Sequence, residues 1–222
     1  VSIRTALGSS YNVPAVKMIA LVGVKEVLQT ATDMGITTLE PTKETLSRVG
    51  LSLALGGGEI RLIDLSAAYS VFTNGGYRSD PIGILKVVDH SGKVLEENKP
   101  QKGRQVISTG NAFQIADILS DNKARETIFG TNSLLNIPGK TVAVKTGTTN
   151  DRRDNWAIGG TPQLVVGTWV GNNDNSPMKS VASGISGASP IWRRIIVEAL
   201  KDKPNVAFEK GNEIVEVEVD SI

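Results

Sequence analysis

The sequence predicts an α+β fold in which an antiparallel sheet is flanked by helices. Apolar residues recur at helical spacing over several stretches of the first 120 residues, and short strand-like runs follow one another between residues 141 and 170. A further helical pattern occupies residues 191–200. Helices that precede closely spaced strands and a closing helix indicate segregated α and β elements, and the short connections favour antiparallel pairing.

Three helices are expected before the sheet. The first covers residues 14–34, begins at Pro14, a residue that suits a first helical position, and is interrupted by Gly23. The second covers residues 61–73, where apolar residues recur at helical spacing, and the third covers residues 111–119.

A peripheral β-hairpin is expected between the second and third helices. Residues 84–89 and 94–96 are two strand-like runs, and residues 90–93 between them have the composition of a turn. The single histidine, His90, lies in that turn without a second metal ligand or catalytic partner nearby in the sequence. We therefore interpret His90 as a solvated loop residue.

The sheet is expected to contain strands at residues 141–145, 156–159 and 164–170, which Gly, Asn and Pro separate from one another. The closing helix at residues 191–200 follows a Ser-Pro pair, with Ser189 as its expected N-cap. This helix completes the α+β pattern.

The chain is expected to form one main unit over residues 1–203 and a short tail over residues 204–222. With 222 residues, of which 40% are hydrophobic, it can build a substantial core. In the tail, charged and apolar residues alternate over residues 213–219, which suits an edge strand or a linker that leads onward. Apolar sequence begins directly after Val1 without an initiator Met, so we interpret Val1 as an internal cut in a longer protein.

Composition excludes several classes of function. Lys and Arg total 24 and Asp and Glu total 23, so the net charge of +1 provides no basic field for nucleic acid. Because the chain has no cysteine and one histidine, it offers no thiol nucleophile, no thiolate or histidine metal cluster and no serine–histidine–acid triad. No run of about 18 apolar residues occurs, so no membrane contact is expected from this segment itself.

A candidate binding motif stands at the end of the first predicted sheet strand. Lys145, Thr146, Gly147 and Thr148 follow the apolar residues 142–144, which places the lysine where a core strand reaches an edge. Alternation puts Lys145 and Gly147 on one face, and the glycine lets another backbone approach the ammonium closely. A cation and two hydroxyls suit the carboxylate of a peptide terminus. Taken alone, the same four residues would more simply end a strand and start a turn.

The residues that follow this motif support its interpretation as a binding motif. Residues 149–156, 159–162 and 165–171 continue in a pattern that resembles the transpeptidase domain of penicillin-binding proteins. Lysine-threonine-glycine is one of three signatures of that family, beside serine-x-asparagine and serine-x-x-lysine. The form of the motif, which runs on to Trp156, is most similar to the bifunctional class A proteins, whose N-terminal glycosyltransferase domain is absent here.

The second signature occurs near the start of the chain. Residues 4–16 resemble the serine-x-asparagine region, with Ser10 and Asn12 as its serine and asparagine, and residues 53–59 and 65–76 resemble the stretch between the two motifs. On an extended segment the two side chains would point the same way. Without the family, both would most simply be residues at the start of the next helix.

The third signature, a serine-x-x-lysine that begins a helix, should precede Ser10 and is missing. Two strings elsewhere match its pattern, Ser120-Asp121-Asn122-Lys123 and Ser176-Pro177-Met178-Lys179. Catalysis needs the serine at a helix N-terminus with the lysine one turn along. Because the first string is expected to end a helix and the second to lie in a loop, we interpret both as coincidental matches.

The resemblance implies a D,D-transpeptidase that cross-links peptidoglycan stem peptides ending in D-alanyl-D-alanine and binds β-lactams, through an acyl-enzyme on an upstream serine. Ser10 would pass a proton to the leaving amine, Asn12 would hold a substrate amide, and Lys145 would supply positive potential. Thr146 and Thr148 would bind the substrate carboxylate. No metal or organic cofactor is implied.

The resemblance also implies a serine β-lactamase/transpeptidase-like fold that is incomplete at its N-terminus. The protein partner would be the missing N-terminal segment of the same protein, and the location the extracytoplasmic side of the bacterial cytoplasmic membrane. The isolated chain is expected to be inactive. Two alternatives remain: a non-catalytic β-lactam or peptidoglycan sensor, which would bind without turnover, and a D,D-carboxypeptidase or β-lactamase, in which water replaces the acceptor amine.

Overall fold

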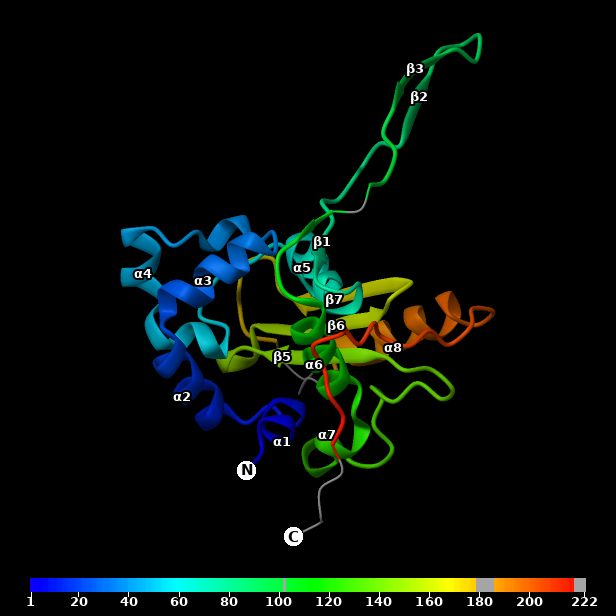
Figure 1. The fold of residues 1–222 in the computed structure, drawn as a ribbon. Coiled ribbons are helices and arrows are strands. Elements are labelled where there is room, and N and C mark those ends of the chain that lie inside the picture. Colours follow the sequence, from blue (N-terminus) through cyan, green and yellow to red (C-terminus); the bar gives the residue numbers. More distant parts are fainter. Residues whose placement is uncertain (102, 179–185, 218–222) are drawn as a thin grey trace.

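The computed structural model describes residues 1–101, 103–178 and 186–217 (Figure 1). The α-helices are α1 (Ile3–Gly8), α2 (Asn12–Val22), α3 (Val24–Asp33), α4 (Lys43–Val49), α5 (Leu62–Thr73), α6 (Thr109–Ser120), α7 (Asn122–Phe129) and α8 (Ala188–Ala199). The strands are β1 (Tyr77–Arg78), β2 (Lys86–Val88), β3 (Val94–Glu97), β4 (Arg104–Gln105), β5 (Ala143–Thr148), β6 (Asp154–Thr161) and β7 (Leu164–Gly171). The 3₁₀ helices are η1 (Thr37–Leu39), η2 (Gly50–Leu55) and η3 (Asn150–Arg152).

The central sheet is an antiparallel meander with the strand order β5-β6-β7. Its register places Lys145 opposite Ile158 and Gly147 opposite Trp156. The strands predicted from the sequence and their antiparallel pairing are therefore confirmed. Within the described residues β5 is an edge strand, so one side of its backbone is available to another chain.

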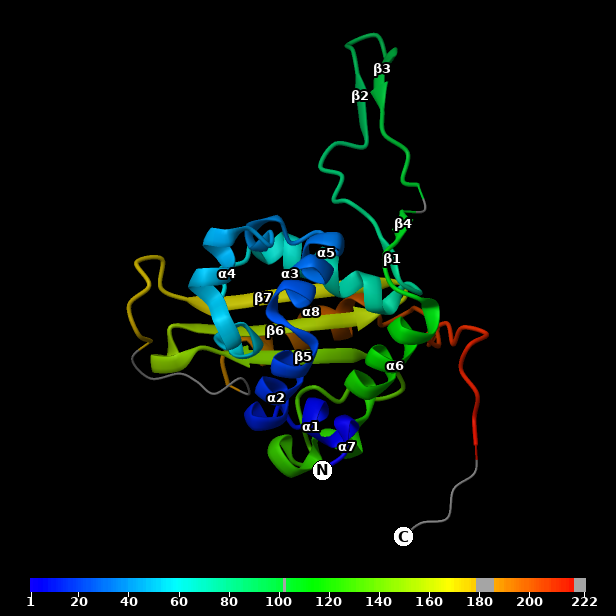
Figure 2. The ribbon, with the colours of Figure 1, turned by 60° about the vertical axis from the view of Figure 1, so that its left-hand side comes forward.

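Helices cover both faces of this sheet, as the two views in Figure 1 and Figure 2 show. Helix α8 covers one face, where Trp192 is fully buried against the strands, and α5 and α6 contact the other. The buried residues of the α8 layer are Leu135, Ile137, Val142, Val144, Ala157, Val166, Ala188, Trp192, Ile196 and Leu200. Because alternate strand residues point to opposite faces, Val144 packs toward α8 and Lys145 points to the other side. The architecture is α+β, as predicted.

A second core lies among the helices that precede the sheet. Helices α3, α4 and α5 surround it, and Leu28 and Val71 are fully buried there. Its buried members are Leu28, Met34, Ile36, Leu39, Val49, Ala68 and Val71. Helix α5 contributes to this core and also contacts β6 and β7, so it joins the helical region to the sheet.

The β2–β3 hairpin projects away from the rest of the molecule in both views (Figure 1 and Figure 2). The Asp89 carboxylate holds its turn by accepting hydrogen bonds from the backbone N–H groups of Ser91 at 2.8 Å and Lys93 at 3.0 Å. His90 is exposed in the turn, as expected. The predicted peripheral hairpin is confirmed.

The predicted interruption of the first helical stretch at Gly23 is confirmed, because two helices, α2 and α3, meet at this glycine, whereas the expectation that Pro14 begins the stretch is wrong, since α2 begins at Asn12. This glycine has φ +102°, and its N–H closes α2 by donating to the Ile19 carbonyl at 2.9 Å. An L-residue rarely adopts such a φ, whereas glycine does so without steric cost. The chain therefore turns at Gly23 instead of continuing as one helix.

The expectation that Ser189 caps the last helix is also wrong. Helix α8 begins one residue earlier, at Ala188, and Gly187 is the residue in the cap position. The Ala188 N–H donates to Asn155 Oδ1 on β6 at 2.6 Å. An acceptor from the sheet therefore satisfies the first turn, which a local sequence rule has no means of detecting.

The described part of the tail, residues 204–217, contains no strand. It crosses the sheet end as an irregular segment whose Phe208 packs with Ala116, Leu119 and Ala143. The Glu213 carboxylate accepts a hydrogen bond from the Gly110 N–H at 2.6 Å, at the start of α6. The described residues of the alternating stretch therefore form no edge strand, and Val215 and Val217 are 78% and 75% exposed, so the interpretation as a linker remains for them. Residues 218–219 lie outside the described part.

Candidate active site

Two side chains that are far apart in the sequence meet at the edge of β5. The Lys145 Nζ donates to Ser10 Oγ at 2.7 Å and to the Thr146 carbonyl at 2.8 Å. Lys145 and Ser10 are 135 positions apart. The contact brings the serine of one family motif and the lysine of another together, as the roles that the resemblance implies for them require.

Ser10 lies in the turn between α1 and α2 and has a left-handed backbone, with φ +59°. Its N–H donates to the Leu7 carbonyl at 3.2 Å, and the Tyr11 N–H donates to the Ala6 carbonyl at 2.9 Å. This pair of bonds closes the C-terminus of α1 in the geometry where glycine is usual. A serine there costs about 1–3 kcal/mol of backbone strain, which points to a use for its side chain.

The sequence interpretation of Ser10 and Asn12 as residues of an extended segment is wrong. Asn12 is the first residue of α2 and is exposed, and Ser10 is in the left-handed turn just before it. The helix α1 continues to Gly8 and leaves no room for a strand before α2. The turn, rather than strand alternation, therefore sets the directions of these two side chains.

The surroundings of Lys145 disfavour its charged form. Burial first, and then the positive charge of Arg125, lower the pKa of Lys145 from its ordinary value of 10.5 to about 8. Burial also lowers the pKa of Arg125, to about 10. At neutral pH Lys145 is still mostly an ammonium that donates to Ser10, but it releases its proton more readily than a surface lysine does.

The other motif residues differ in how open they are. Gly147 and Thr148 are exposed at the end of β5, whereas Thr146 is only 9% exposed. A Cβ added to Gly147 would lie 3.8 Å from the Trp156 side chain, an ordinary contact, so neighbours within the fold do not require glycine here. The absence of a side chain instead leaves open the space beside Lys145.

Asn155 is a site residue that the sequence analysis missed. It is fully buried, its Nδ2 donates to Thr148 Oγ1 at 3.0 Å, and its Oδ1 accepts from the Ala188 N–H. It therefore holds the exposed threonine against the start of α8. The only sequence signal was an amide residue directly before the apolar run of β6, which is too common to single out.

The two serine-x-x-lysine strings are not arranged as a nucleophile. Ser120 is the last residue of α6, and its hydroxyl donates to the Asp117 carbonyl at 2.9 Å, while Asp121 caps α7. Ser176 lies in the loop after β7, and the lysine of its string, Lys179, is outside the described residues. Both expectations about position, a helix end for Ser120 and a loop for Ser176, are confirmed.

The described residues lack the features of two other kinds of site. No group of three or more His, Cys, Asp or Glu side chains is placed to hold a metal ion there. Across the same part of the chain, none of the helices combines the length and the apolar character needed to cross a bilayer.

Comparison with known protein families identifies the kind of domain to which the Ser10–Lys145 contact belongs. The model of the penicillin-binding protein transpeptidase domain matches residues 1–195. The chain belongs to this family. The family and the fold predicted from the motifs are thereby confirmed.

Curated transpeptidase relatives match nearly the whole chain but are much longer. Penicillin-binding protein 1A of Aquifex aeolicus is 34% identical over 219 residues, which are 99% of this chain and 28% of that protein. Penicillin-binding protein 2D of Bacillus subtilis is 33% identical over 99% of this chain and 31% of its own length. The chain thus spans about three tenths of these relatives, and the name 1A agrees with the predicted likeness to class A proteins.

Solved transpeptidase structures share the fold. Penicillin-binding protein 1A from Haemophilus influenzae superposes with a TM-score of 0.84 at 26% identity, over 99% of this chain and 37% of that one. The PonA1 protein from Mycobacterium tuberculosis, in complex with penicillin V, gives a TM-score of 0.76 at 26% identity, over 96% of this chain and 60% of that one.

Proposed function

We propose that this chain is the C-terminal part of a D,D-transpeptidase that cross-links peptidoglycan stem peptides and is acylated by β-lactams. The observation that carries the proposal is the 2.7 Å contact between Lys145 Nζ and Ser10 Oγ at the edge of β5. It joins the serine-x-asparagine and lysine-threonine-glycine signatures of the family in one place. Membership of the transpeptidase family supplies the class of reaction.

The proposed substrate lies along β5 as an added strand. The backbone at this edge has no partner strand within the described residues, and the exposed Gly147 allows a close approach. Main-chain hydrogen bonds of this kind bind extended peptides without regard to most side chains. The terminal carboxylate then reaches Thr148, an exposed residue whose hydroxyl accepts a hydrogen bond from Asn155, with Thr146 as the second proposed contact.

The proposed reaction proceeds in two acyl transfers. A serine attacks the carbonyl between the two terminal D-alanines, and the C–N bond breaks so that an ester to the enzyme forms and D-alanine leaves. An amine of a neighbouring stem peptide then attacks the ester, which forms the cross-link and regenerates the serine. The backbone N–H of Thr148 and that of the nucleophile would stabilise the oxyanion in both steps.

The contact between Ser10 and Lys145 gives each residue a role in these steps. Ser10 accepts a hydrogen bond from the ammonium, so its own proton is free to move toward the leaving amine. Lys145 supplies positive potential where negative charge develops, and Asn12, exposed at the start of α2, holds a substrate amide. The roles of all three residues are parts of this proposal.

The nucleophile is proposed to lie outside these 222 residues. Within the described residues neither Ser120 nor Ser176 begins a helix with a lysine one turn along. The proposed protein partner is therefore a further segment of the same protein, which would carry the serine and, by likeness to class A proteins, a glycosyltransferase domain. The proposed location is the extracytoplasmic side of the bacterial cytoplasmic membrane, where stem peptides occur.

The test is acylation of the full-length protein by a fluorescent penicillin, with the adduct located by mass spectrometry of its peptides. We expect an adduct on a serine outside this chain, and D-alanine release with formation of cross-linked product from a stem peptide. An adduct on Ser120 or Ser176, or no adduct at all, would contradict the proposal. D-alanine release without cross-linking would instead indicate a carboxypeptidase, and binding without release would indicate a sensor.

A further inference from the structure

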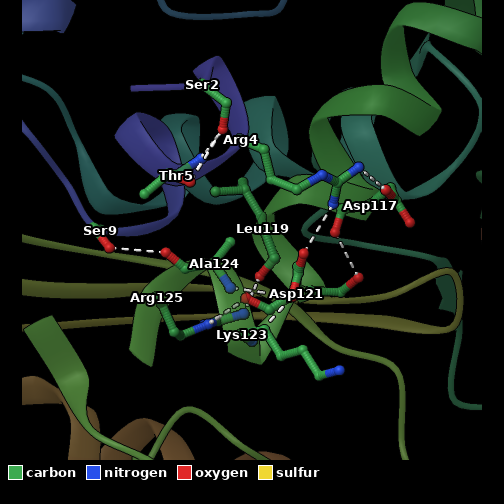
Figure 3. Close-up of polar contacts among 11 residues, drawn as sticks. Ser2, Arg4, Thr5, Ser9, Asp117, Leu119, Asp121, Lys123, Ala124 and Arg125 are labelled. Carbon is green, nitrogen blue, oxygen red and sulfur yellow. Dashed lines mark hydrogen bonds and ion pairs between the residues drawn. The ribbon is translucent and has the colours of Figure 1, made fainter. Parts of the chain in front are cut away.

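The junction between α6 and α7 touches both sides of the Ser10–Lys145 pair. Figure 3 shows its residues Leu119, Asp121, Ala124 and Arg125 between α1 and the sheet. This junction contains the Ser-Asp-Asn-Lys string that resembled a catalytic motif but does not have the geometry of one. Its contacts indicate a different use.

On one side the junction holds the turn that carries Ser10. The neighbouring Ser9 is 1% exposed, and its hydroxyl donates to the Ala124 carbonyl at 2.8 Å. Gly8 lies so close to Ala124 that an added Cβ would be 2.9 Å from the alanine Cβ. The end of α1 therefore rests directly on α7, with no space for movement toward it.

Ion pairs on the outer side fix the same arrangement. Arg4 on α1 contacts the carboxylates of Asp117 at 2.5 Å and Asp121 at 3.2 Å (Figure 3). Asp121 also accepts hydrogen bonds from the N–H groups of Lys123 at 2.9 Å and Ala124 at 3.1 Å, which caps α7. One carboxylate thus joins the start of α7 to α1.

On the other side Arg125 reaches the strand that carries Lys145. Arg125 is 2% exposed and donates to the Val144 carbonyl at 3.5 Å, to the Asp121 carbonyl at 3.4 Å and to the Leu119 carbonyl. Arg125 makes no close ion pair within the described residues, and the charge nearest to balancing it is the more distant Asp121 carboxylate. Burial of a charge without a close counter-ion is costly. The fold therefore keeps a cation between α7 and β5 at a cost that hydrophobic packing would avoid.

We propose that Arg125 is a positioning residue that ties β5 to the junction carrying the Ser9–Ser10 turn and thereby sets the separation of Lys145 and Ser10. The inference rests on the proposed function, because that separation matters only if the pair takes part in acyl transfer. Arg125 acts through its neighbours and does not touch the substrate.

The charge of Arg125 affects a measurable quantity, the pKa of Lys145, that would not change if Arg125 had a purely structural role. Among the charged groups near it, Asp121 lies at the start of its own helix, Lys145 faces it from β5, and Arg4 reaches the junction from α1. Burial is the main cause of the low pKa of Lys145, and the positive charge of Arg125 lowers this pKa further, because it disfavours protonation of a neighbouring amine. Loss of the charge should raise that pKa, and a lysine at position 125 should keep it low.

The experiment compares Arg125→Met and Arg125→Lys in the full-length protein. Acylation by fluorescent penicillin is measured as a rate, and the protonation of Lys145 is measured separately by competitive acetylation across pH with peptide mass spectrometry. For Arg125→Met we expect an acylation rate about tenfold to a hundredfold lower, because a small misplacement of reacting groups lowers a rate by about this factor. We also expect the titration midpoint of Lys145 at a higher pH than in the wild-type protein. Arg125→Lys should restore the low midpoint and part of the rate.

Two serines of the same region provide a matched control. Ser9→Ala and Ser120→Ala each remove one hydroxyl that donates to a backbone carbonyl, but only Ser9 joins the junction to the Ser10 turn. Ser9→Ala should slow acylation, and Ser120→Ala should leave it unchanged. This pair also tests the inference if Arg125→Met does not fold.

The outcomes separate the inference from the proposed function. An unchanged Lys145 midpoint in Arg125→Met, or equal rates in Ser9→Ala and Ser120→Ala, overturns the positioning role. An unlabelled wild-type protein, or normal labelling after Lys145→Ala, overturns the proposed function instead. In that case the midpoint of Lys145 still shows whether Arg125 governs its charge.

Discussion

The edge of β5 and the β2–β3 hairpin are both short antiparallel structures, but different forces hold them. The hairpin turn depends on Asp89 and residues within four positions of it, and apolar side chains such as Leu95, 62% exposed, gain little burial. At β5 the decisive contact joins Lys145 to a residue 135 positions away, over a core that includes Val144 at 2% exposure. Local chemistry suffices for the first region, whereas the second needs the whole fold.

The largest effect should follow removal of the ammonium at the β5 edge. Lys145→Ala in the full-length protein should lower the rate of acylation by penicillin at least about a hundredfold, because preorganised charge at a reacting centre is worth that much. The matched control is Lys93→Ala in the hairpin turn, which should acylate at the wild-type rate. Time courses of fluorescent labelling measure both rates. Similar rates for the two variants would mean that the ammonium at the β5 edge matters no more for acylation than a lysine in the hairpin turn.

The pH dependence of acylation should show whether the charge of Lys145 at the β5 edge is needed. The pKa of Lys145 is lowered to about 8, so its ammonium is present below pH 8 and is lost as the pH rises through that value. If the charge is needed, the acylation rate should fall by about tenfold per pH unit above the midpoint. Rates measured between pH 6 and 10 test this, and a rate that instead rises through pH 8 would show that Lys145 acts as a neutral base.

Loss of the buried Asn155 amide, which donates a hydrogen bond to Thr148, should have an intermediate effect, on the stability of the domain. Asn155→Ala leaves the Ala188 N–H and the Thr148 hydroxyl without their partner, which should cost about 1–3 kcal/mol of stability, measured as a lower unfolding temperature of the domain. Asn155→Asp is the control, since a carboxylate still accepts from the start of α8. If Asn155→Ala were as stable as Asn155→Asp, the bond to α8 would be unimportant.

The smallest effect on stability should come from a valine-to-threonine change in the hairpin, compared with the same change in the α8 core. Val144→Thr places a hydroxyl in the α8 core and should destabilise the protein by about 1–3 kcal/mol. Val94→Thr makes the same change at an exposed hairpin position, 44% accessible, and should stay within about 0.5 kcal/mol of wild type. Chemical unfolding compares them, and equal losses would mean that the hairpin is packed against a partner in solution.

Elements with several turns or a marked alternation could be predicted from the sequence. The second helix, the hairpin and the meander of the sheet all appear at close to the expected residues. Helices α1 and α7 were missed, because 6 and 8 residues provide too few turns for a periodic pattern. Their absence from the prediction also hid the left-handed turn at Ser10, which exists only because α1 ends there.

The sequence by itself determined the family and indicated Ser10, Asn12 and Lys145 as candidate site residues, because both depend on residue types at fixed spacing within short motifs. The tertiary structure alone decided that Lys145 donates a hydrogen bond to Ser10. It also decided that Asn155 donates to Thr148 and that Arg125 donates to the Val144 carbonyl, next to Lys145 in the chain. Each of these contacts joins segments that no local pattern connects. They form only when burial of the two cores brings distant helices and strands together and leaves each buried polar group in need of a partner.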